Sequence, residues 1–187
     1  MLKMFKYKAC ASAVKSQFER RSISCFNDKL LLLNTNLKLS DNNRTVSIVS
    51  KEQPYPDHPD RFDLWPQLLC RDALTGRCYW EVELNRRVYL SVTYRGIRRK
   101  GDGDDCAFGQ NNQSWSLIYT DADGYCASHN KRAVPVYVDC PAGTLSFYRV
   151  FSDALIHIHT FNTTFTEPLY PGFRFTLHCS SVSLCSL

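Results

Sequence analysis

The stretch Arg77-Cys78-Tyr79-Trp80-Glu81-Val82-Glu83-Leu84 decides the fold class of this chain of 187 residues. Its aromatic and β-branched residues alternate with polar ones, the period of two that is typical of a β-strand. Turn residues bound it on both sides, and a second strand-like run follows at Val88–Tyr94. We therefore predict that the two runs form a hairpin across a short polar loop. We expect Trp80 to lie in a core, with its indole N–H bonded to an acceptor.

The rest of the chain repeats this pattern of short strand-like runs and turns. Beyond residue 30 it contains about eleven or twelve such runs, at the roughly 8–12-residue spacing typical of sandwiches and barrels, and no helical period. One pair, Val134–Cys140 and Thr144–Val150, is predicted to form a hairpin across Pro141-Ala142-Gly143. The sequence predicts an all-β fold, and we favour two packed antiparallel sheets over a barrel.

The net charge of +5 is confined to the N-terminal segment. Residues 1–29 carry seven Lys or Arg and two acids, whereas residues 30–187 have a net charge of zero. A nucleic-acid partner is therefore not expected. Within this segment, residues 9–21 are predicted to be a short basic helix or to be disordered. No run of 18 apolar residues occurs, so no membrane span is expected.

Nine cysteines are present, in an odd number and without a C-x-x-C pattern. We expect free, buried thiols of a cytoplasmic protein, with a disulfide framework and a zinc site as the alternatives. The cysteines are Cys10, Cys25, Cys70, Cys78, Cys106, Cys126, Cys140, Cys179 and Cys185.

Several residue groups were tested for chemistry, and none predicts a catalytic or metal site. Glu81 and Glu83 share one face of a strand, whereas paired catalytic carboxylates approach a substrate from separate segments. His157 and His159 share a strand face, but no motif supplies a third metal ligand. The basic run 95–100 is followed at once by the acidic loop 102–105, so a phosphate site is not expected either. We expect no enzymatic activity, no metal and no cofactor.

Five motifs, in order along residues 34–187, resemble those of the PRY-SPRY domain family. The most specific is Thr75-Gly76-Arg77-Cys78-Tyr79-Trp80-Glu81-Val82, which is similar to the family signature G-x-x-Y-W-E-V. The others are Leu37-Lys38-Leu39-Ser40-Asp41-Asn42-Asn43-Arg44-Thr45-Val46, Arg61-Phe62-Asp63, Val136–Tyr148 and Leu169-Tyr170-Pro171-Gly172-Phe173. The residues of these motifs resemble those of the C-terminal domains of fish tripartite-motif-like and NOD-like-receptor-like proteins and of stonustoxin-type toxins.

The resemblance implies a bent, concanavalin-like β-sandwich with a PRY part at about 30–75 and a SPRY part at about 76–187. It implies a non-catalytic module that recognises a protein or peptide epitope, as the targeting module of an innate-immune or ubiquitin-ligase-type protein. The family's loops map onto seven candidate contact residues, with Tyr119 and Phe165 as aromatic anchors and core packing as the alternative for Phe165. The seven are Tyr94, Arg95, Ile118, Tyr119, Thr120, Asp121 and Phe165.

Two other functions stay open at the level of the sequence. A carbohydrate-binding sandwich has a similar architecture and exposed aromatics, and the basic segment 1–29 would suit a fragment of a membrane-active toxin-like protein. The chain also departs from the family pattern in two places. The usual opening L-D-P-x-T-A is replaced by residues 25–34, and the stretch 129–134 is short.

Overall fold

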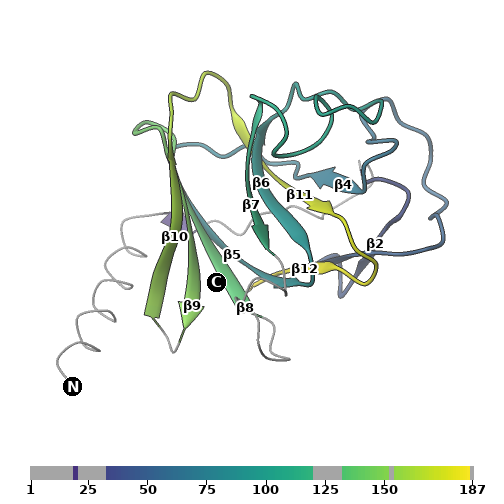
Figure 1. The fold of residues 1–187 in the computed structure, drawn as a ribbon, viewed down its shortest axis with the longest axis horizontal. Helices are drawn as coiled ribbons and strands as arrows, with labels where there is room; N and C mark the ends of the chain where they lie inside the picture. The colour runs from purple at the N-terminus through teal and green to yellow at the C-terminus, as the bar shows by residue number, and fades with distance from the viewer. Residues whose placement is uncertain (1–18, 21–32, 120–131, 152–153, 186–187) are drawn as a thin grey trace.

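The computed structural model describes residues 19–20, 33–119, 132–151 and 154–185. Their regular structure is entirely β, with no helix in these ranges (Figure 1). The strands are β1 (Glu19–Arg20), β2 (Leu37–Ser40), β3 (Thr45–Ile48), β4 (Gln67–Leu69), β5 (Arg77–Asn85), β6 (Val88–Tyr94), β7 (Ser114–Tyr119), β8 (Arg132–Asp139), β9 (Thr144–Phe151), β10 (Ala154–Asn162), β11 (Leu169–Phe175) and β12 (Ser181–Leu184).

The strands form two packed sheets, which confirms the predicted sandwich. The larger sheet, called sheet A here, has the order β10-β9-β8-β5-β12-β3-β2, and the smaller sheet B has the order β4-β11-β6-β7. Neighbours along both orders are antiparallel. The two-residue strand β1 adds to β5 in parallel. The last strand of the sequence, β12, therefore lies inside sheet A, between β5 and β3.

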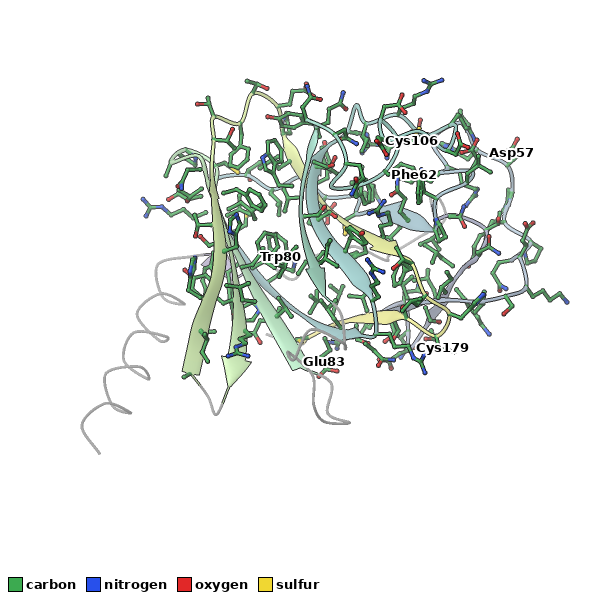
Figure 2. All side chains as sticks on the ribbon, viewed as in Figure 1. Asp57, Phe62, Trp80, Glu83, Cys106 and Cys179 are labelled. Atoms are coloured by element: carbon green, nitrogen blue, oxygen red, sulfur yellow. The ribbon has the colours of Figure 1, made fainter. Side chains whose placement is uncertain are left out.

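Trp80 lies in the core between the two sheets, as predicted (Figure 2). It is 2% exposed and belongs to a cluster of apolar side chains from both sheets. The expectation for its indole was wrong, because Nε1 has no hydrogen-bond partner in the part of the chain that the structure describes. The benefit of burying the large ring outweighs the cost of one unpaired donor.

The predicted hairpin of β5 and β6 does not form. The two strands belong to different sheets, and Arg86, with φ 59°, lies in the connection that crosses between them. Each strand is already flanked on both sides in its own sheet, β5 by β8 and β12 and β6 by β11 and β7. The predicted hairpin of β8 and β9 is confirmed, with Gly143 at φ 67° in its turn.

All seven residues of β6 are buried, because both faces of sheet B are covered. Its inner face packs on sheet A, and the connection 95–113 lies over its outer face. A second, smaller cluster forms beneath this connection, from Phe62, Leu69, Ile97 and Phe108. Figure 2 shows Phe62 and Cys106 together at this side of the molecule.

A polar clamp ties the 95–113 connection to β4. The Gln67 side chain is fully buried, and its Nε2 donates to the carbonyl of Cys106 at 2.5 Å. Its Oε1 accepts from the backbone N–H of Phe108 at 3.2 Å. Both ends of one buried amide are thereby satisfied, so the side chain fixes the connection without an unpaired polar group.

Two sequence expectations need correction. Glu19 and Arg20 form a strand, so the helix predicted over 9–21 is wrong at these two positions; its other residues lie outside the described ranges. Cys70 is disulfide-bonded rather than free. Cys106 is a free, buried thiol, as expected, and Cys179 and Cys185 are also free, although Cys179 is exposed.

Candidate functional site

The residues predicted to contact a protein epitope do not share one surface, because they fall at opposite ends of sheet B. The register of β6 and β7 pairs the first residue of β6 with the last of β7. Tyr94 and Arg95 lie where β7 begins, whereas Ile118 and Tyr119 lie where β7 ends. About five residues of strand, roughly 17 Å, separate the two ends. Two further candidates, Thr120 and Asp121, lie outside the described residues.

Stacked aromatic rings build the Tyr94 end. Tyr94 is 8% exposed, and its ring meets Trp115 edge-on with the centroids 5.3 Å apart. Trp115 packs edge-on against Phe165 in turn, at 5.2 Å. The Tyr94 hydroxyl accepts hydrogen bonds from the backbone N–H of Thr166 at 3.0 Å and from its hydroxyl at 3.3 Å. Tyr94 is therefore a packing residue in this structure.

The segment 162–166 is also fixed to the scaffold. The backbone N–H of Thr163 donates to the carbonyl of Gly143 in the β8–β9 turn at 2.9 Å. Phe165 is half-buried against the main core, which favours core packing over an anchor role. Arg95 is exposed, with its guanidinium 5.5 Å from the ring centroid of Tyr170.

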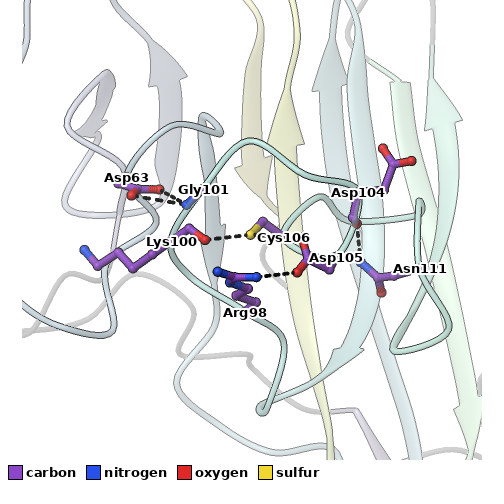
Figure 3. A network of polar contacts seen from close by, with 8 residues as sticks. All are labelled: Asp63, Arg98, Lys100, Gly101, Asp104, Asp105, Cys106 and Asn111. Carbon is purple, nitrogen blue, oxygen red and sulfur yellow. Dashed lines mark hydrogen bonds and ion pairs between the residues drawn. The ribbon is translucent and has the colours of Figure 1, made fainter.

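The basic run 95–100 is used within the 95–113 connection, as the acidic residues after it suggested (Figure 3). Arg98 forms an exposed ion pair of 3.0 Å with Asp105. The Asp63 carboxylate accepts from the backbone N–H of Gly101 at 3.1 and 3.3 Å. Arg99 lies over the ring of Phe62 at 4.4 Å, and burial lowers the pKa of its guanidinium to about 10. These contacts support a structural role for the run.

At the other end of sheet B, one row of side chains crosses the outer face from β4 to β7. The row consists of Gln67, Arg174, Tyr89 and Ile118, which the strand registers place opposite one another. Arg174 is 3% exposed and lies between two rings, 3.7 Å from the centroid of Tyr89 and 5.2 Å from that of Trp65. The guanidinium therefore forms a cation–π stack with Tyr89, the residue that lies next to Ile118 in the row.

The exposed large apolar side chains of the described residues lie at this end of sheet B, on both of its edges. Ile118 is 47% exposed, Leu64 61% and Leu177 48%. Leu64 precedes Trp65, and Leu177 follows the end of β11, whose Phe175 N–H donates to the carbonyl of Pro66 at 2.9 Å. We call this region the Ile118 surface; it consists of Leu64, Tyr89, Ile118, Arg174 and Leu177.

Four of these five residues were not found from the sequence. Period-two patterns place Tyr89 and Arg174 on strands, but only the pairing of β4, β11, β6 and β7 brings them beside Ile118. Leu64 and Leu177 lie outside strands, and in the sequence they look like ordinary apolar residues. An exposed apolar group rimmed by polar residues typically marks an interaction site, a signal that requires the surface to be known.

The side chains tested for chemistry are accounted for within the structure. His157 and His159 are exposed on β10, but a register shift between them breaks the shared face that was predicted. His157 Nε2 lies 2.7 Å from the Thr160 hydroxyl, which also contacts Ser146 Oγ at 2.8 Å. Among the described residues, no three His, Cys, Asp or Glu side chains are placed to hold a metal ion. Within the same ranges, no helix is long and apolar enough to cross a membrane.

Two family models match consecutive stretches of the chain that contain the strands β2 to β12. The SPRY-associated domain PRY matches residues 33–74, and the SPRY domain matches residues 77–186.

Among curated proteins, the chain is similar to fish toxins and to tripartite-motif proteins. It is 43% identical over 154 residues to Neoverrucotoxin subunit alpha of Synanceia verrucosa, covering 75% of this chain and 22% of that protein. It is 38% identical over 150 residues to Tripartite motif-containing protein 16 of Mus musculus, covering 73% of this chain and 27% of that protein. The chain thus spans about a quarter of the length of these relatives.

Solved structures share the fold. The stonustoxin structure superposes with a TM-score of 0.77 at 33% identity, over 89% of this chain and 29% of that one. The TRIM65 PSpry domain superposes with a TM-score of 0.72 at 24% identity, over 90% of this chain and 91% of that one. The matched models, the relatives and the two-sheet architecture agree: the chain belongs to the PRY-SPRY domain family.

Proposed function

We propose that this PRY-SPRY domain is a non-catalytic module that recognises a protein or peptide through the Ile118 surface. SPRY domains are commonly protein-interaction modules. The observation that carries the proposal is that the large apolar side chains of Ile118, Leu64 and Leu177 are each exposed at the same end of sheet B. Apolar side chains in the centre of such a surface, shielded from water by a partner, contribute most of the energy of protein association.

The fixed scaffold beneath the surface supports this role. Tyr89 and Arg174 are almost fully buried, so the floor of the surface is rigid before a partner arrives. A preformed site avoids the entropy cost of ordering side chains on binding. By contrast, the candidate residues at the Tyr94 end are engaged in packing, which leaves Arg95 as the exposed side chain of that group.

The test is affinity purification with mass spectrometry, using the full chain and a matched pair of charge substitutions. Ile118→Asp places a carboxylate on the proposed surface, and Lys51→Asp places one on an exposed position outside it. Both variants should remain folded, since exposed substitutions change stability by about 0.5 kcal/mol or less. We expect the partners of the wild type to persist with Lys51→Asp and to be lost with Ile118→Asp. The same partner set for both variants would remove the Ile118 surface from consideration.

The toxin relatives do not favour a membrane-active function for this chain. The matched region is about 150 residues long in both Neoverrucotoxin subunit alpha and Tripartite motif-containing protein 16. A domain shared by both kinds of protein does not by itself distinguish them. Liposome co-sedimentation at low salt is the corresponding test, and we expect the chain to stay in the supernatant.

We further propose a cytoplasmic protein whose PRY-SPRY domain targets an innate-immune or ubiquitin-ligase-type activity. Cys106, Cys179 and Cys185 are free thiols, which suits a reducing compartment, whereas Cys70 is disulfide-bonded. Fractionation of cells that express the full chain tests the location. Recovery of the chain mainly in the secretory pathway would contradict it.

A further inference from the structure

The charge next to the Ile118 surface is positive. Arg86 and Arg87 lie in the connection between β5 and β6, and both are exposed. Arg87 precedes Tyr89 by two residues, so strand geometry places it on the outer face of sheet B, in line with Tyr89. Arg87 therefore borders the surface, and a second cation, Arg174, lies in its floor.

Arg174 shows that these cations influence one another. Its Nε is buried without a hydrogen-bond partner among the described residues. Burial lowers the pKa of its guanidinium, and the nearby charge of Arg87 lowers it further. Like charges held close together in a partly desolvated site repel, and an anion placed between them relieves that repulsion.

Among the described residues, no acidic side chain forms an ion pair with Arg87. The ion pairs of Arg77 with Asp139 and of Arg98 with Asp105 do not involve it. The carboxylate of Asp104 raises the pKa of Arg174, but by less than the charge of Arg87 lowers it. Arg87 is thus an exposed cation that can meet an anion.

Resting on the function proposed above, we propose that the Ile118 surface binds an acidic peptide segment that carries an apolar anchor residue. The anchor would cover Ile118, and the carboxylates of the segment would lie toward Arg87. Charge complementarity of this kind accelerates association and excludes basic competitors, while the apolar contact supplies most of the affinity.

The probe is a phage-displayed library of random dodecamer peptides, selected against the full wild-type chain. Selected peptides are synthesised and titrated against the wild type, Ile118→Asp, Arg87→Gln, Arg87→Glu and the remote charge control Lys51→Glu. Each peptide is also made with its Asp and Glu replaced by Asn and Gln. Circular dichroism confirms that the variants are folded.

We expect the selected peptides to be rich in Asp and Glu beside an apolar residue. We also expect that Ile118→Asp no longer binds them. Arg87→Gln should weaken them about threefold and Arg87→Glu about tenfold, with Lys51→Glu unchanged. The amide versions should bind more weakly to the wild type and lose the sensitivity to Arg87.

Two results would overturn the inference, and they differ in what else they overturn. Peptides that depend on Ile118 but carry no acids, or that bind Arg87→Glu as tightly as the wild type, refute the acidic partner and leave the recognition surface intact. A selection that yields no peptide weakened by Ile118→Asp refutes the recognition surface and the acidic partner together.

Discussion

The backbone N–H of Thr163 donates a 2.9 Å hydrogen bond to the carbonyl of Gly143, which joins the segment after β10 to the β8–β9 turn. The approach is so close that a Cβ at position 143 would overlap the Thr163 carbonyl. Gly143 also has φ 67°, a conformation that glycine adopts without strain. One glycine therefore sets both the turn and the position of the 162–166 segment.

Gly143→Ala should destabilise the protein by about 3 kcal/mol, from left-handed backbone strain plus the clash with Thr163. Gly76→Ala is the matched control, because Gly76 has the same φ of 67° but open space around its missing Cβ. We expect Gly76→Ala to cost about 1 kcal/mol, since only the strain remains. Urea unfolding measures both, and equal losses would show that the clash is relieved by movement of the segment.

Gln67→Leu should destabilise the protein by about 3 kcal/mol, because it leaves the carbonyl of Cys106 and the N–H of Phe108 buried without their partner. Hydrogen exchange should increase selectively in residues 105–109. Gln53→Leu is the control, since the Gln53 side chain donates an exposed bond to the Lys51 carbonyl. Unchanged exchange in residues 105–109 would mean that the apolar contacts of Phe108 alone hold the connection.

Phe165→Ala and Leu64→Ala should have opposite effects on stability and binding. Phe165 packs on Trp115, so its loss should cost about 2 kcal/mol of stability and leave partner binding unchanged in the folded protein. Leu64 is 61% exposed, so its truncation should change stability by less than about 0.5 kcal/mol and weaken binding. Thermal unfolding and the affinity purification above provide the readouts. If Phe165→Ala is folded but loses its partners, the recognition surface lies at the Tyr94 end of sheet B instead.

Cys185 should make stability fall at alkaline pH. Burial, together with Glu83 and Glu81, raises the pKa of its thiol from 9.0 to about 11. The folded state then holds the proton more firmly than the unfolded state, so this contribution is complete below pH 9 and is lost as the pH rises to 11. Urea unfolding at pH 8 and pH 11 should show a smaller loss for Cys185→Ser than for the wild type. The control is Cys179→Ser, at an exposed thiol. Between pH 8 and pH 11 it should lose as much stability as the wild type.

Part of the fold was predictable from local signals and from the family motifs. The turn Pro141-Ala142-Gly143 between two strand-like runs predicted the β8–β9 hairpin, and the five family motifs predicted the two-sheet sandwich. The same local reasoning failed between β5 and β6, because adjacency in sequence does not reveal whether a short connection turns within a sheet or crosses to another. On β10, the register shift at His157 and His159 was not visible either, since alternation assumes a regular strand.

The candidate site was predictable only in part. Ile118 was identified from the family's loops, but its neighbours Tyr89 and Arg174 come from β6 and β11, which are far apart in the sequence. Phe165 looked like an aromatic anchor because its contact with Trp115 depends on how the 162–166 segment returns to the scaffold. Sequence patterns indicate which residues can be exposed, and packing decides which of them are.

The place of β12 between β5 and β3 also affects how the protein is made. On a ribosome, β2 and β3 emerge early, yet they cannot join β5 until residues 181–184 have been synthesised. Such long-range strand pairing slows folding and leaves strand edges exposed in the nascent chain. A stop codon before Ser181 would therefore divide sheet A in two, and the affected chains would depend on chaperones rather than merely lose a terminal strand.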